Sequence, residues 1–127
     1  MYRQYRKYCV WIPKYGRKIL RGCIAETLRE AIRDKTRELG VETIALAVMP
    51  DHIHLIVSAP PSISPSELVR HLKDYTARRL GEEYPWLRKR GCIWARGYWV
   101  STLGDVSIEK ALNYVLSQGK PKASNRR

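Results

Sequence analysis

Apolar residues recur along this chain with two different periods. A short apolar run, or alternation at every second residue, is typical of a strand, whereas recurrence every three or four residues is typical of a helix. On this basis we predict strand, helix, strand, strand, helix, strand and helix, at residues 8–13, 20–39, 42–49, 52–59, 66–80, 92–103 and 107–118. Gly40 and the turn Pro50-Asp51 separate elements in this pattern.

This β-α-β-β-α-β-α order predicts an α+β fold of the ferredoxin/RRM-like kind, with helices packed on one face of an antiparallel sheet. A C-terminal helix follows the last strand. The 127 residues suit a single domain spanning 1–127, because a chain of this length has room for one hydrophobic core. We expect residues 119–127 to form a basic, flexible tail.

Two histidines interrupt the apolar run at 52–59. His52 and His54 leave the same face of the strand, while Ile53 and Leu55 point the other way, into the core. Two neutral imidazoles side by side provide two neighbouring ligands for a metal ion. Taken alone, the pair is more simply explained as part of a polar outer face of the strand.

The last predicted helix carries a phenol beside its buried face. Its apolar residues recur at positions 108, 111, 112, 115 and 116. At about 100° per residue, Tyr114 lies off this face, and Gln118 lies one turn further along on the same side. An amide oxygen and two imidazoles would make a ligand set suited to Mg²⁺ or Mn²⁺ holding a phosphate. The alternative is that Tyr114 is a surface residue and Gln118 an ordinary helix end.

The charge balance indicates a polyanionic partner. Lysine and arginine number 24 against 12 acidic residues, a formal net charge of +12. Nucleic acid is favoured over a membrane surface, because the sequence has no basic amphipathic helix and no lipidation signal. It also has no secretory signal and no apolar run near the roughly 20 residues that cross a bilayer, so we expect a cytoplasmic protein.

Basic and aromatic residues are the candidates for contacting nucleic acid. Aromatic side chains near the basic clusters could stack on bases, although Trp99 is expected in the core because it alternates with outward-facing residues. The basic residues that we expect to contact DNA phosphates are Lys14, Arg17, Arg70, Lys73, Arg78 and Arg79.

Four segments together resemble the single-tyrosine HUH transposases of the insertion-sequence 200/605 group. They are, in chain order, MPDHIHLIV, LVRHLKDYTARRL, WARGYWVSTLGD and NYVLSQ. The similarity covers about Tyr8 to Gln118. A His-hydrophobic-His motif is common by chance, but its combination with the other three segments is specific. The resemblance implies that Tyr114 is a nucleophile and that His52, His54 and Gln118 bind Mg²⁺ or Mn²⁺.

The resemblance also implies a reaction and a partner. Enzymes of this group cleave and rejoin single-stranded DNA at hairpin-containing element ends through a 5′-phosphotyrosine intermediate. Such an intermediate conserves the bond energy, so rejoining needs no ATP. In this group the tyrosine helix of one subunit lies over the histidines of the other. We therefore expect a homodimer with composite active sites assembled in trans.

Three other functions remain compatible with parts of the sequence. A non-catalytic single-stranded nucleic-acid-binding module would account for the basic and aromatic surface, but it leaves Tyr114 and Gln118 unexplained. A replication initiator or relaxase would share the histidine pair, but such proteins are usually longer. A metal nuclease that activates water would not need Tyr114.

Overall fold

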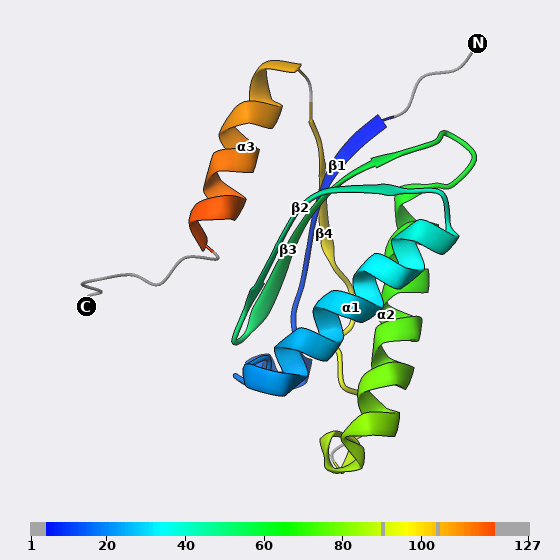
Figure 1. Cartoon of the computed structure of the whole chain (residues 1–127), viewed down its shortest axis with the longest axis vertical. Coiled ribbons are helices and arrows are strands. Elements are labelled where there is room, and N and C mark those ends of the chain that lie inside the picture. Colours follow the sequence, from blue (N-terminus) through cyan, green and yellow to red (C-terminus); the bar gives the residue numbers. More distant parts are fainter. Residues whose placement is uncertain (1–4, 90, 104, 119–127) are drawn as a thin grey trace.

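In the computed structural model, a four-stranded antiparallel sheet separates two helices from a third (Figure 1). The structure describes residues 5–89, 91–103 and 105–118, and within the last range the side chains of 110–115 and 117. The elements are β1 (Tyr5–Trp11), η1 (Lys14–Gly16), α1 (Gly22–Glu38), β2 (Glu42–Met49), β3 (His52–Ala59), α2 (Pro65–Glu83), η2 (Pro85–Arg88), β4 (Trp99–Thr102) and α3 (Asp105–Gln118). The predicted α+β fold is confirmed, and the predicted tail at 119–127 lies outside the described residues.

The strand order β2-β3-β1-β4 places β3 and β1 at the centre of the sheet. Along β3, the odd-numbered side chains Ile53, Leu55 and Val57 enter a large core shared with α1 and α2. Ile56, which points the other way, joins a smaller core with Val115 of α3. The alternation of a strand therefore determines which side chains face each layer of helices.

Helices cover both faces of the sheet. α1 and α2 lie together on one side, and α3 lies on the other (Figure 1). α2 starts at a capping box, in which the Ser64 side chain accepts from the backbone N–H of Glu67 and the Glu67 side chain accepts from that of Ser64. α3 packs through its predicted apolar face, of which Ala111, Leu112 and Val115 are described.

The predicted strand at 92–103 is wrong over most of its length, since only Trp99–Thr102 is a strand. The backbone before β4 is held in part by a side chain of α2. The amino group of Lys73 donates to the carbonyl oxygens of Ala95 and Gly97, at 2.7 and 2.9 Å. Gly97 also has a φ of 81°, which ends extended structure just before β4. The same segment pairs with residues 12–14 only through an isolated bridge, in which the N–H of Lys14 donates to the carbonyl of Ile93 at 2.8 Å and the N–H of Ala95 to that of Ile12 at 2.9 Å.

Candidate active site

Two imidazoles and a phenol meet on the α3 face of the sheet. The rings of His52 and His54 lie 4.6 Å apart between centroids, which confirms that the two side chains project together from β3. The ring of Tyr114 lies 5.5 Å from that of His54 and perpendicular to it. Val115 anchors α3 in the smaller core, so its neighbour Tyr114 sits at the margin of that contact, with 51% of its surface exposed.

Each of the two imidazoles forms a hydrogen bond through its Nδ1 atom. Nδ1 of His52 lies 2.7 Å from Oδ1 of Asp51, and Nδ1 of His54 lies 2.6 Å from the hydroxyl oxygen of Tyr8. A carboxylate can only accept, so Nδ1 of His52 is the donor, and the neutral form of this ring has its lone pair on Nε2. Sequence reasoning did not identify Asp51 or Tyr8 as residues of the site.

His54 is neutral at physiological pH. Its pKa is lowered to about 4, first because burial disfavours the imidazolium and second because the charge of His52 is nearby. The side chain is 5% exposed. Burial also raises the pKa of the Tyr8 phenol, and Tyr114 adds to this effect. A neutral imidazole has a lone pair available for a metal ion without first losing a proton.

The Nε2 atoms of His52 and His54 are suited to bind a cation. Nε2 of His54 is buried and has no hydrogen-bond partner within the part of the chain that the structure describes. A buried polar atom of this kind needs a partner, and a divalent ion is one that an imidazole nitrogen accepts. Among the described residues, no set of three or more His, Cys, Asp or Glu side chains surrounds the pair. The side chain of Gln118 lies outside the described part, so its role as third ligand stays a prediction.

Two of the basic residues predicted to contact DNA are bonded within the protein. Arg79 is 3.3 Å from Asp34 of α1 and 3.5 Å from Glu83, and it donates to the Tyr75 hydroxyl at 2.9 Å. It therefore ties α1 to α2. Lys73 is half-buried and holds the segment before β4. For both, DNA contact remains a prediction alongside these structural roles.

The other predicted basic residues differ in exposure. Arg70 and Arg78 are exposed on α2. Lys14 and Arg17 lie in and just after η1 and are only partly exposed, and Arg17 Nε donates to the carbonyl of Lys14 at 3.2 Å. In the described residues, no helix is long and apolar enough to cross a membrane.

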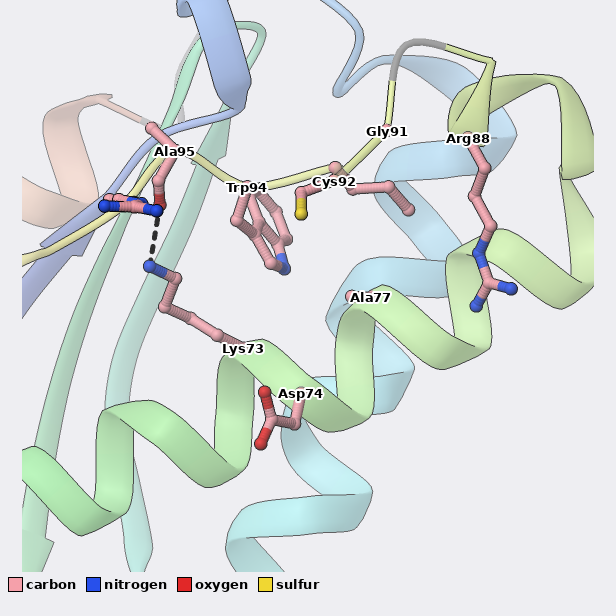
Figure 2. A pocket seen from close by; sticks show the side chains of 10 residues that line it. Lys73, Asp74, Ala77, Arg88, Gly91, Cys92, Trp94 and Ala95 are labelled. Atoms are coloured by element: carbon pink, nitrogen blue, oxygen red, sulfur yellow. Dashed lines mark hydrogen bonds between the residues drawn. The ribbon is translucent and has the colours of Figure 1, made fainter.

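A cavity of about 490 Å³ lies between α2 and the segment at 91–96 (Figure 2). Trp94 forms an apolar wall, and its Nε1 donates to Thr76 at 3.0 Å. Arg88 and Arg96 line the same cavity, although sequence reasoning had not selected them. A smaller cavity adjoins it and is lined by residues including Arg70, Lys73 and Tyr98. The two cavities form a basic, partly aromatic surface on the α2 side of the sheet.

Trp99 lies at the surface, contrary to the expectation that it is a core residue. It is 53% exposed. Its ring lies roughly perpendicular to that of Tyr8, with the two ring centroids 5.3 Å apart. The reason for the exposure is the position of its strand, β4, within the sheet. β4 is an edge strand, whereas α3 packs over β2 and β3, so the helix leaves the indole uncovered. Trp99 is thereby placed beside the histidine site.

Sequence comparisons show which proteins this chain resembles. Residues 2–118 match a protein family described as transposase IS200 like. The ISDra2 transposase TnpA of Deinococcus radiodurans is 33% identical over 118 residues, which cover 91% of this chain and 84% of that protein. The transposase for insertion sequence element IS200 of Salmonella typhimurium is 28% identical over 112 residues, 86% of this chain and 73% of that protein.

Solved structures share the fold. A crystal structure of a protein of Deinococcus radiodurans R1 assigned as a transposase superimposes with a TM-score of 0.76, at 29% identity and 93% coverage of both chains. A REP-associated tyrosine transposase bound to a REP hairpin gives a TM-score of 0.71 at 20% identity, covering 91% of this chain and 67% of the other.

Proposed function

Because this chain belongs to the IS200-like transposase family, we propose that it cleaves and rejoins single-stranded DNA at the hairpin-containing ends of an insertion sequence. The observation that carries the proposal is the convergence of Tyr114 and His54, whose rings lie 5.5 Å apart although they come from α3 and β3. Binding of nucleic acid alone does not account for a phenol beside a buried imidazole nitrogen that has no hydrogen-bond partner among the described residues.

Tyr114 is the proposed nucleophile. Its hydroxyl oxygen attacks a backbone phosphorus, the phenol proton leaves, and the bond from phosphorus to the 3′ oxygen breaks as that oxygen takes up a proton. The products are a 5′-phosphotyrosine and a free 3′-OH. Attack by a 3′-OH on the phosphotyrosine reverses the step and joins DNA without ATP. The half-exposed position of Tyr114 allows a DNA backbone to reach it.

His52, His54 and, as the proposed third ligand, Gln118 would hold Mg²⁺ or Mn²⁺. Such an ion, when bound, polarises the phosphate and neutralises charge that develops in the transition state. The protein's own contribution is to keep His54 neutral and both imidazoles oriented. Burial lowers the pKa of His54 to about 4, and Asp51 bonds Nδ1 of His52 so that Nε2 is left for coordination.

The proposed partner is single-stranded DNA that contains a hairpin. A net charge of +12 supports a nucleic-acid partner. One protein of the same fold, the REP-associated tyrosine transposase, has been solved bound to a REP hairpin. We propose that the basic surface formed by the two cavities along α2 contributes phosphate contacts.

Adduct formation tests the proposed function. The protein is incubated with Mn²⁺ and a labelled single-stranded oligonucleotide containing a hairpin from the ends of its own element, and then analysed on a denaturing gel. We expect a labelled protein band that chelator abolishes, and no band when the same sequence is fully duplex. A gel shift with no denaturation-resistant band would instead favour the non-catalytic binding module.

The basic surface leads to a prediction about binding. We expect the double substitution Arg88→Ala and Arg96→Ala to weaken hairpin binding. The slope of log affinity against log salt concentration should become shallower by roughly 1 to 2, about one for each lost phosphate contact. Fluorescence anisotropy at several salt concentrations measures both the affinity and its dependence on salt. The matched control is Arg33→Ala, an exposed arginine of α1. An equal loss in this control would show that the cavity has no special part in binding.

We also propose that the protein acts as a homodimer in which Tyr114 of one subunit serves the histidines of the other. Two tyrosines in one assembly hold two cut DNA ends at once, which strand exchange requires. Mixing Tyr114→Phe protein with His54→Ala protein tests this arrangement. Composite sites predict that the mixture recovers adduct formation, because one of its sites has both groups intact. No recovery would mean that Tyr114 acts with the histidines of its own chain, beside which it lies here.

A further inference from the structure

Tyr8 of β1 reaches the histidine site from the neighbouring strand. In the β1–β3 ladder Tyr8 is opposite Ile56, so it is the diagonal neighbour of His54 on the same face of the sheet. A long side chain spans that diagonal, and the Tyr8 hydroxyl ends 2.6 Å from Nδ1 of His54. The Trp99 ring packs roughly perpendicular to the phenol ring, with the two centroids 5.3 Å apart.

The two tautomers of His54 differ in whether Nε2 carries a proton or a lone pair. If Nε2 carries the proton, the Tyr8 hydroxyl donates to Nδ1, and a buried N–H is left with no acceptor among the described residues. If Nδ1 carries the proton, it donates to the Tyr8 oxygen, and Nε2 presents a lone pair. Only the second tautomer can bind a cation through Nε2.

We propose that Tyr8 is a positioning residue, whose hydroxyl oxygen accepts a hydrogen bond from Nδ1 of His54 and thereby directs Nε2 toward the bound metal ion. This inference rests on the proposed metal-dependent function. It gives each imidazole its own acceptor, the Asp51 carboxylate for His52 and the Tyr8 phenol for His54. Groups that hold a ligating histidine in this way strengthen metal binding although they do not touch the metal.

Tyr8→Phe tests the inference, because it removes the hydroxyl and keeps the ring that packs on Trp99. The matched control is Tyr15→Phe, which removes a hydroxyl from a side chain that is 69% exposed. Calorimetry on DNA-free protein measures the dissociation constant for Mn²⁺. We expect Tyr8→Phe to weaken Mn²⁺ binding about tenfold and Tyr15→Phe to leave it unchanged. In the adduct assay, Tyr8→Phe should need a correspondingly higher Mn²⁺ concentration for half-maximal rate and should approach the wild-type rate at saturation.

The tautomer gives a second readout that needs no metal. Nitrogen NMR of the metal-free protein should show His54 protonated on Nδ1 in the wild type and a mixture of tautomers in Tyr8→Phe. A Mn²⁺ affinity of Tyr8→Phe within about twofold of wild type, far below the tenfold or larger effect of losing such a partner, would overturn the inference. So would a wild-type His54 protonated on Nε2. Absence of Mn²⁺ binding in the wild type would overturn the metal-dependent function, and the tautomer would then still decide whether Tyr8 orients His54.

Discussion

Tyr114→Phe should abolish the covalent protein–DNA adduct. The substitution removes one oxygen atom, the proposed nucleophile, from a side chain that is 51% exposed, so the fold and the ring contact with His54 should persist. We expect the rate of adduct formation to fall by roughly 10³-fold or more, since losing an essential nucleophile leaves only binding and orientation to act. Hairpin affinity should stay near the wild-type value. A denaturing gel measures the adduct, and anisotropy measures binding.

Tyr15→Phe is the matched control, because Tyr15 is also an exposed tyrosine, at 69%, but lies in η1 and lines neither of the two cavities. It should form the adduct at the wild-type rate. If Tyr114→Phe still cut the oligonucleotide without forming an adduct, the protein would be a nuclease that activates water. If both variants formed the adduct normally, another residue would be the nucleophile.

Local alternation was sufficient to predict the faces of β3. The side-chain period of a strand is two, so placing Ile53 and Leu55 in the core necessarily places His52 and His54 together on the opposite face. Information of this kind lies within a few consecutive residues. Alternation does not identify Asp51, which lies in the turn just before β3 and whose carboxylate reaches the ring of the next residue, His52.

The segment before β4 could not be predicted in the same way. Its apolar residues Ile93 and Trp94 look like part of a strand, and both are indeed buried. The backbone that follows them, however, is held at Ala95 and Gly97 by the side chain of Lys73, which is more than twenty positions away in the sequence. Apolar pattern reports burial and not the hydrogen-bond partner, so it cannot distinguish a strand from an irregular segment packed on a helix.

The position of Tyr8 and Trp99 in the site depends on strand order. Alternation shows that a side chain faces one side of the sheet, but not which strands α3 covers. Trp99 is exposed because β4 lies at the edge, and Tyr8 meets His54 because β1 pairs with β3 in one particular register. Similarly, the helical period placed Tyr114 off the buried face of α3, but only the packing of α3 opposite α1 and α2 brings it to His54. Long-range pairing therefore completes a site of which the sequence showed the parts.

His54→Ala should remove metal binding and adduct formation together. His54 Nε2 is a buried nitrogen without a hydrogen-bond partner in the described residues, and we expect it to be a direct ligand. Loss of groups that merely orient a ligand costs 10- to 100-fold in metal affinity, so loss of the ligand itself should cost roughly 100-fold or more. Calorimetry with Mn²⁺ on DNA-free protein measures this effect. Adduct formation should be lost at Mn²⁺ concentrations that saturate the wild type.

His71→Ala is the matched control, because His71 lies on α2, on the other side of the sheet from the proposed ligands. It should bind Mn²⁺ and form the adduct as the wild type does. Hairpin affinity measured without metal should be the same for both variants, since neither substitution removes a lysine or arginine that lines the two cavities. If His54→Ala kept wild-type Mn²⁺ affinity, the cation would bind elsewhere, and the buried nitrogen of His54 would need another partner. If it lost adduct formation while Mn²⁺ binding was intact, His54 would act on the phosphate or on Tyr114 directly, and not through a metal ion.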